Sequence, residues 1–138
     1  KQFHTNESKT IIGQSLGGLL ATQVLFQKPE LFDKYIIISP SLWWDAASLL
    51  NYNIDNLSKK IRRNTSVYIG VGKEGIVPGK VPRVMEVDAN MLADKIQAQK
   101  ITNLTVYFDY LPQEDHATIE HQAIYNAFKI IYTPSPAP

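Results

Sequence analysis

Ser15 lies at the centre of a G-x-S-x-G sequence, Gly13-Gln14-Ser15-Leu16-Gly17. The residues before it are β-branched and those after it are apolar at helical spacing, so the motif falls at a turn from a strand into a helix. Such a turn, the nucleophile elbow, holds a serine hydroxyl clear of a sheet at a helix N-terminus. A glycine-rich turn could instead cradle a phosphate, but the lysine of a P-loop and the G-x-G-x-x-G spacing are both missing. We therefore interpret Ser15 as a nucleophile.

A serine hydroxyl is a weak nucleophile at neutral pH and needs a base within hydrogen-bonding distance. The chain has three histidines. His116 follows an apolar run and a proline, which places it beyond a strand, at the sheet edge where Ser15 also emerges. His4 precedes the first strand and is interpreted as a surface residue, and His121 falls inside the last helix. We expect His116 to be the general base.

An acid that orients the imidazole would complete a triad. When the chain order is serine, acid and histidine, the acid belongs to the loop after the third strand. Glu74 occupies that place, and its alternative interpretation is an exposed loop glutamate beside Lys73. Asp115 and Glu114 adjoin His116, but immediate neighbours rarely direct their side chains at one another. We therefore expect Glu74 to be the acid and rank the other two second.

The segment Ser39-Pro40-Ser41-Leu42-Trp43-Trp44-Asp45 follows the second strand at the same edge. Two adjacent tryptophans are costly to expose, so they either cap the core or form an apolar wall for a ligand. We expect Trp43 and Trp44 to share both roles. Gln14, next to the nucleophile, is a further candidate for substrate binding, and the backbone N–H of Leu16 is the expected donor to an oxyanion.

Strands and helices alternate along the chain. Continuous apolar runs such as residues 35–38 are typical of strands covered on both faces of a parallel sheet. The expected strands are residues 9–12, 35–38, 67–71 and 104–111. The expected helices are residues 16–27, a stretch around Ile54, Leu57 and Ile61, residues 82–99 with Pro82 in the first turn, and a last helix marked by Ala117, Ile124, Phe128 and Ile131. This order predicts an α/β fold with a parallel sheet, right-handed crossovers and helices on both faces.

The composition is that of one globular domain, since 44% of the 138 residues are hydrophobic, 20% are charged and the formal net charge is +1. The basic run at residues 59–63 is interpreted as a solvated helix end, so we expect no nucleic-acid partner.

The chain has no cysteine, which excludes disulfides and thiolate metal sites. His116 and His121 are five residues apart and would diverge on a helix, so we expect no metal site there with Glu120. The longest strongly apolar run is too short to span a bilayer.

Four segments carry a family resemblance: Ile-Gly-Gln-Ser-Leu-Gly-Gly-Leu, Ile-Ser-Pro-Ser-Leu-Trp-Trp-Asp, Gly-Val-Gly-Lys-Glu and Leu-Pro-Gln-Glu-Asp-His, in that order. From about residue 9 to residue 132 the chain resembles the esterase D-related family of α/β hydrolases, above all its siderophore (enterobactin-type trilactone) esterase branch. The resemblance implies an α/β-hydrolase fold, hydrolysis of carboxylic esters without a cofactor, and Ser15 and His116 as the catalytic pair. In that branch the third member varies, and some members are serine–histidine dyads, so triad and dyad both stay open.

The resemblance also implies an upstream half of similar length that carries the first strands and a second oxyanion-hole donor. The strand at residues 9–12 gives the same indication, because it is apolar on both faces, as a central strand is, yet has only downstream neighbours. We therefore interpret residues 1–132 as the C-terminal half of an α/β-hydrolase domain and residues 133–138 as a proline-rich tail. Besides a small-molecule ester hydrolase, an acyltransferase with the same serine and a non-catalytic binding module on the same scaffold remain alternatives.

Overall fold

The computed structural model describes residues 3 and 5–133 of the chain. Within that part, four strands form one parallel sheet in the order β1-β2-β3-β4. Their bounds are β1 Thr10–Gln14, β2 Lys34–Ile38, β3 Thr65–Gly72 and β4 Leu104–Leu111. Gln14 pairs with Ile38 of β2, and Gly72 pairs with Leu111 of β4. The loops that follow the strands therefore all begin along one edge of the sheet.

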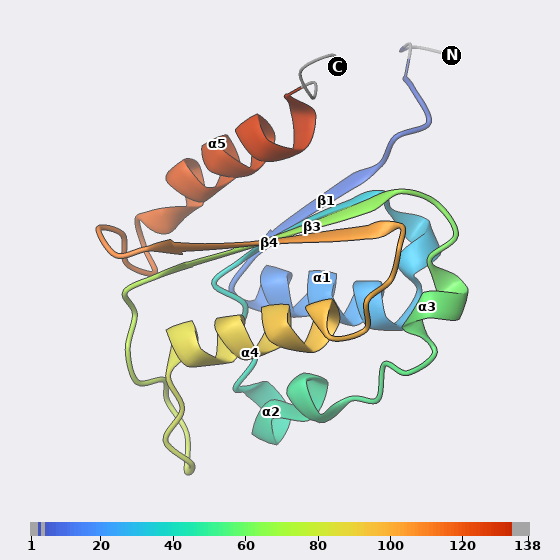
Figure 1. Cartoon of the computed structure of the whole chain (residues 1–138). Coiled ribbons are helices and arrows are strands. Elements are labelled where there is room, and N and C mark those ends of the chain that lie inside the picture. The colour runs from blue at the N-terminus through green and yellow to red at the C-terminus, as the bar shows by residue number, and fades with distance from the viewer. Residues whose placement is uncertain (1–2, 4, 134–138) are drawn as a thin grey trace.

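Helices cover both faces of this sheet (Figure 1). On one face lie α1 (Leu16–Gln27) and α4 (Met85–Gln97), and on the other lies α5 (Ile119–Tyr132). The remaining helices of the described residues are short: η1 Pro29–Leu31, α2 Trp44–Asn51 and α3 Leu57–Lys60. The predicted α/β class, with a parallel sheet between two helical layers, is confirmed.

Two apolar clusters hold the layers together. The larger lies between the sheet and the pair α1 and α4, and includes Leu25, Ile37 and Leu92. The smaller lies under α5 and joins Ile36 and Ile38 to alanines of that helix. Successive side chains of β2 enter opposite clusters, so residues 35–38 are all fully buried, which explains the continuous apolar run in the sequence. Each buried isoleucine side chain stabilises the folded state by about 1.5–3 kcal/mol relative to an exposed one.

A buried polar group anchors α5 on the sheet. The Tyr68 hydroxyl donates to Oδ2 of Asp109 at 2.5 Å, and the Asn126 amide donates to the same oxygen at 2.9 Å. Burial raises the pKa of Tyr68, and the hydrogen bond to Asp109 raises it further, so the hydroxyl remains a donor. These bonds join β3, β4 and α5, and they fix the helix that follows the His116 loop.

The structure departs from the sequence-based elements at several places. Ile54 and Ile61 lie outside α3, and Ala117 precedes α5, although each was expected to mark a helix. The helix expected from Pro82 begins at Met85, because residues 76–84 form a looped ribbon in which Val77 N–H donates to the carbonyl of Arg83. Pro82 therefore lies outside the helix, and its expected place in the first turn is wrong. Helix α2 was not predicted from the sequence. Three of its consecutive residues, Asp45 to Ala47, adopt left-handed backbone angles, which helical periodicity does not predict.

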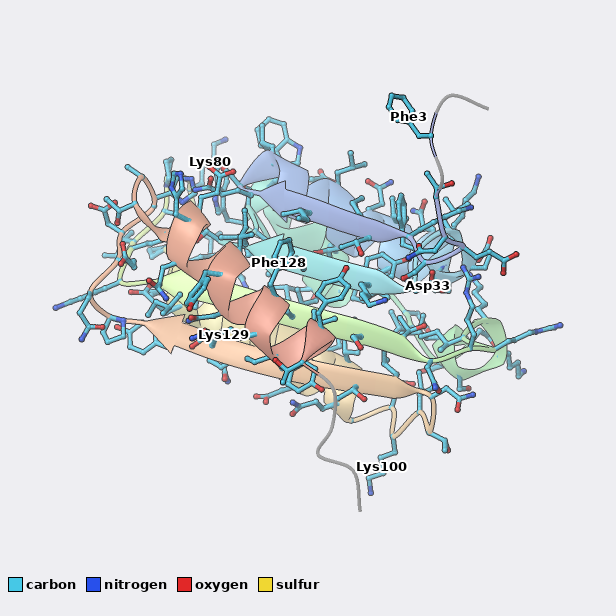
Figure 2. All side chains as sticks on the ribbon, turned by 90° about the horizontal axis from the view of Figure 1, so that it is seen from above. Phe3, Asp33, Lys80, Lys100, Phe128 and Lys129 are labelled. Carbon is cyan, nitrogen blue, oxygen red and sulfur yellow. The ribbon has the colours of Figure 1, made fainter. Side chains whose placement is uncertain are left out.

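Strand β1 lies at the edge of the described sheet, where it pairs with β2 alone. Its Ile12 is 43% exposed, whereas the apolar side chains of β2 are buried. Figure 2 shows α5 running over the middle strands with β1 to one side of it. Within the described ranges, no helix is both long and apolar enough to cross a membrane. Of the predicted tail, Thr133 caps α5, and residues 134–138 lie outside the described residues.

Candidate active site

Ser15 occupies the turn between β1 and α1, as the G-x-S-x-G motif predicts. Its backbone has φ 56° and ψ −117°, a conformation that is strained for a residue other than glycine. Hydrogen bonds hold it there: Ser15 N–H donates to the carbonyl of Ile38 at 3.0 Å, and Ser41 N–H donates to the carbonyl of Ser15 at 3.1 Å. Within the described residues the Ser15 hydroxyl does not cap α1. It is free to face other groups at the sheet edge.

The two glycines of the motif are not equivalent. A Cβ added at Gly13 would lie 2.2 Å from the carbonyl oxygen of Gly17, so only glycine allows the helix to start so close to the strand. A Cβ added at Gly17 would meet no atom of the described residues within 4 Å. The tight approach of strand and helix therefore requires glycine at position 13 and, sterically, not at position 17.

The structure brings Ser15, His116 and Glu74 into one hydrogen-bonded row. Nε2 of His116 lies 3.1 Å from Oγ of Ser15. Nδ1 of the same ring lies 2.6 Å from Oε2 of Glu74. The side chain of Glu74 is only 3% exposed, and that of His116 is 48% exposed. A buried carboxylate behind a solvent-accessible imidazole that contacts a serine is the arrangement of a serine–histidine–acid triad.

Glu74 is held from several sides. Its Oε1 accepts hydrogen bonds from the hydroxyl of Ser39 and from Gly72 N–H. Its backbone N–H donates to Oε1 of Glu86, in the first turn of α4, and Gly75 N–H donates to both oxygens of that carboxylate. Glu86 thus fixes the loop backbone while Ser39 and Gly72 contact the Glu74 side chain. The alternative interpretation of Glu74 as an exposed loop residue is excluded by this burial.

The His116 loop is tied to its neighbours and shaped by Asp115. Lys73 N–H donates to the carbonyl of Glu114 at 2.8 Å, which joins the acid loop to the histidine loop. Oδ1 of Asp115 accepts hydrogen bonds from the N–H groups of Ala117 and Thr118. The second-ranked acids therefore do not contact the imidazole: Asp115 builds the turn into α5, and Glu114 contributes its backbone.

Gln14 has a different contact from the expected one. Its side-chain amide donates to the backbone carbonyl of His116 at 2.7 Å. This bond connects the end of β1 to the histidine loop across the sheet edge. The side chain of Gln14 therefore holds that loop, and substrate binding by Gln14 stays a prediction. Leu16 is the first residue of α1, and its N–H has no acceptor inside the helix, as the oxyanion prediction requires.

A cavity of about 300 Å³ opens beside the nucleophile, and its walls include Ser15, Ser41, Trp43, Val77, Pro78 and His116. Trp43 is partly buried, packs against the core and lines the cavity, so its position is compatible with both roles expected of the tryptophan pair. Trp44 is 53% exposed and lines a separate hollow beside Leu19 and Tyr52. The structure thus places Trp43, but not Trp44, at the cavity that contains the row of hydrogen bonds.

Among the described residues no group of three or more acidic, histidine or cysteine side chains is arranged to hold a metal ion. His121 is exposed on α5, and His4 lies outside the described residues. The sequence reasoning missed Ser39, Ser41 and Glu86. A signal for the two serines was available, because they follow the second strand at the same edge as Ser15. Glu86 carried no comparable signal, since its contact depends on where α4 begins.

The parallel sheet, the elbow at Ser15 and the histidine loop after the last strand together define the α/β-hydrolase class. A sequence profile of the family described as Hydrolase_4, serine aminopeptidase, S33, matches residues 1–123. The chain belongs to this family.

Curated relatives and a solved structure agree with this assignment. A segment of 43 residues is 46% identical to the siderophore triacetylfusarinine C esterase of Aspergillus fumigatus, and it covers 31% of this chain and 15% of that protein. A segment of 67 residues is 37% identical to the ferri-bacillibactin esterase BesA of Bacillus subtilis, and it covers 47% of this chain and 23% of that protein. The crystal structure of the BES protein from Bacillus cereus matches with a TM-score of 0.76 and 29% identity, over 88% of this chain and 44% of that one. The expected resemblance to siderophore esterases of the α/β-hydrolase class is confirmed.

These matches cover only part of each relative. The aligned segments span less than a quarter of the two curated esterases and less than half of the solved structure. What the relatives do as whole proteins therefore comes to this chain only as a proposal.

Proposed function

We propose that this chain carries the catalytic row of a serine esterase, with Ser15 as nucleophile, His116 as general base and Glu74 as the acid that orients it. The observation that carries the proposal is the continuous row of contacts, 3.1 Å from Ser15 Oγ to His116 Nε2 and 2.6 Å from His116 Nδ1 to Glu74 Oε2. The first distance allows proton transfer from Ser15 to His116 without rearrangement of the loops, and the second allows Glu74 to stabilise the imidazolium through a hydrogen bond. The burial of Glu74 favours a triad over a dyad.

The chemistry follows from these positions. His116 Nε2 takes the proton of Ser15 as Oγ attacks the ester carbonyl, and Glu74 Oε2 stabilises the imidazolium that forms. The carbonyl oxygen becomes an oxyanion, to which Leu16 N–H donates from the start of α1. As the tetrahedral intermediate collapses, His116 gives its proton to the departing alcohol, which leaves an acyl-serine. Water, deprotonated by His116, then attacks the acyl group. In the second collapse His116 returns this proton to Oγ of Ser15, which releases the acid and restores both side chains.

The substrate class we propose is carboxylic esters of siderophore type. Support comes from the relatives, which are named as siderophore esterases, and from the cavity beside Ser15, whose wall includes Trp43. We further propose that the active enzyme includes residues upstream of this chain, which supply a second oxyanion donor and complete the sheet beside β1. The extra length of the relatives supports this point.

The test is turnover by the full-length protein that carries this chain, on a cyclic trilactone siderophore, a simple aryl ester and the matching aryl amide. We expect ester cleavage that exceeds amide cleavage. Ser15→Ala should reduce it by a factor on the order of a million while leaving the fold intact, because the nucleophile acts as a unit with its base. Turnover by Ser15→Ala within tenfold of wild type would refute the proposal.

Two experimental outcomes would favour one of the alternative functions over a serine esterase. If an added alcohol acceptor captured the acyl group in preference to water, the same serine would serve an acyltransferase. If the folded wild-type protein cleaved no ester and its Ser15 failed to react with a fluorophosphonate, the scaffold would be a non-catalytic binding module.

A further inference from the structure

The turn that follows β2 lies between the two ends of the catalytic row. Ser39 and Ser41 flank Pro40 in this turn, and both serines are buried. The hydroxyl of Ser39 contacts Oε1 of Glu74, and the hydroxyl of Ser41 lies 3.2 Å from that of Ser15. One short turn therefore contacts the acid with one serine and the nucleophile with the other.

The contact with Glu74 decides which carboxylate oxygen faces the imidazole. Oε1 receives two donors, the Ser39 hydroxyl and Gly72 N–H, while Oε2 faces Nδ1 of His116. A carboxylate can rotate about its terminal torsion, which has a broad, two-fold profile. In a buried site, leaving an oxygen without donors is costly, so two donors on Oε1 keep Oε2 directed at the histidine.

The backbone of Ser39 is shaped for this contact. Ser39 N–H donates to the carbonyl of Gly70 at 2.8 Å, which continues the pairing of β2 with β3 beyond the last residue of the strand. Its φ is then 42°, in the left-handed region that few residues other than glycine adopt. Strained residues of this kind persist where the surroundings over-determine them, and they cluster at functional sites. Here the strained turn directs a fully buried hydroxyl at the acid.

We propose that Ser39 is a positioning residue, which holds the Glu74 carboxylate so that Oε2 supports the imidazolium of His116 during catalysis. The inference rests on the proposed function, since it assigns a role in that same row. Ser39 is fully buried, and only Glu74 stands between it and His116, so it acts on the reaction through the acid and not by touching substrate.

The test compares Ser39→Ala and Ser39→Gly with wild type in the full-length protein. Both variants remove the hydroxyl, and Ser39→Gly also relieves the positive φ, so a loss shared by the two belongs to the hydroxyl and not to backbone strain. We expect kcat to fall about 10- to 100-fold, the range for losing a hydrogen bond to a charged acceptor, with KM unchanged. Thermal unfolding confirms that each variant is folded.

A spectroscopic readout separates positioning from general damage. In wild type, the proton on Nδ1 of His116 should give the strongly deshielded resonance of an imidazole N–H bonded to a carboxylate. Ser39→Ala and Ser39→Gly should shift or broaden this resonance. Ser41→Ala is the matched control: it removes a buried hydroxyl from the same turn but not from Glu74, so the resonance should persist even if turnover falls.

The outcomes distinguish this inference from the proposed function. If wild type is active and both Ser39 variants keep its kcat and its resonance, Ser39 has no positioning role although the esterase assignment stands. A loss of kcat in the Ser39 variants with the resonance unchanged also overturns the inference. If folded wild type is inactive towards every ester and unreactive at Ser15, the proposed function fails first, and the positioning role fails with it.

Discussion

At the scale of single residues, the site depends on backbone angles that ordinary residues avoid. Ser15 and Ser39 both have positive φ, and each is held by a hydrogen bond from its N–H to the carbonyl of a residue in the neighbouring strand, Ile38 or Gly70. The sheet therefore supplies the free energy that keeps both hydroxyls in place. The side chain of Ser15 contacts His116, and that of Ser39 contacts Glu74.

Glu74→Gln should reduce ester turnover far more than Asp115→Asn. The amide cannot stabilise the imidazolium that forms on His116, and a comparable change in a serine protease triad costs about 10⁴ in kcat. Asp115 contacts backbone N–H groups at the start of α5, so its amide variant should mainly lower the unfolding temperature. Steady-state kinetics and thermal unfolding of both variants check this. A larger loss of turnover in Asp115→Asn would assign the role of the acid to Asp115. Undiminished turnover in both variants would indicate a serine–histidine dyad.

Trp43→Ala should weaken the preference for aromatic over acetyl esters, and Trp44→Ala should leave it unchanged. Trp43 lines the cavity that holds Ser15, whereas Trp44 faces a separate hollow. An aromatic ring adds about 0.5–1.5 kcal/mol to stacking beyond area burial, which corresponds to roughly a two- to tenfold change in relative kcat/KM. A competition assay with the aromatic and the acetyl ester measures this ratio of kcat/KM values. An equal preference in wild type and both variants would make each tryptophan structural.

At the scale of elements, the elbow joins β1 to α1 over a single residue. The sequence was sufficient to predict this junction, because β-branched residues, a tight glycine motif and helical spacing succeed one another within residues 10–27. It also predicted β4 to the residue, since prolines and polar residues delimit its apolar run. It could not fix the start of α4 at Met85, because the ribbon at residues 76–84 forms through pairing between distant loop positions.

Gly13→Ala should destabilise the protein, and Gly17→Ala should not. The methyl group at Gly13 would overlap the Gly17 carbonyl at 2.2 Å, and overpacking of this kind costs at least about 1–3 kcal/mol. At Gly17 the methyl group would meet no described atom within 4 Å, and alanine is the better helix former. Thermal unfolding of the two single variants, alike in chemistry and four positions apart, is the measurement. Equal unfolding temperatures would contradict the close approach at the elbow.

The catalytic row shows where sequence reasoning at this scale stops. Ser15, His116 and Glu74 could be proposed from their places after strands, but the sequence could not tell a buried Glu74 from an exposed loop glutamate. The burial and direction of the Glu74 side chain depend on contacts with Ser39, Gly72 and Glu86, which are far from one another in the sequence. Likewise the left-handed turn at Asp45 to Ala47, which follows the tryptophan pair, could not be read from composition.

At the scale of the whole molecule, the sheet has one poorly covered edge. Within the described residues β1 pairs with β2 alone. Ile12 in β1 is exposed, and so are Leu16 and Leu20 in α1, the helix that packs against β1. An exposed parallel strand flanked by apolar side chains is a template for association. Within the described residues β1 is therefore an edge strand, and the central position expected for it stays a prediction.

The 138-residue chain expressed by itself should associate through the β1 edge and show little esterase activity. Size-exclusion chromatography with an activity assay checks both points. Leu20→Lys should reduce association, because it places a charge in the exposed apolar strip next to β1. Leu31→Lys, at an exposed leucine of η1, is the matched control and should not. A monodisperse, fully active monomer would show that this edge needs no further strand.

The central claim is that Ser15 is the activated nucleophile. Its most direct test is reaction of the folded full-length protein with a fluorophosphonate, followed by mass spectrometry of the intact protein and of its peptides. We predict a single adduct on Ser15, formed quickly in wild type and slowed by orders of magnitude in His116→Ala, because the serine hydroxyl is a weak nucleophile without its base. An ester-cleaving protein whose adduct maps to another residue, or whose Ser15 reacts equally well without His116, would contradict the account.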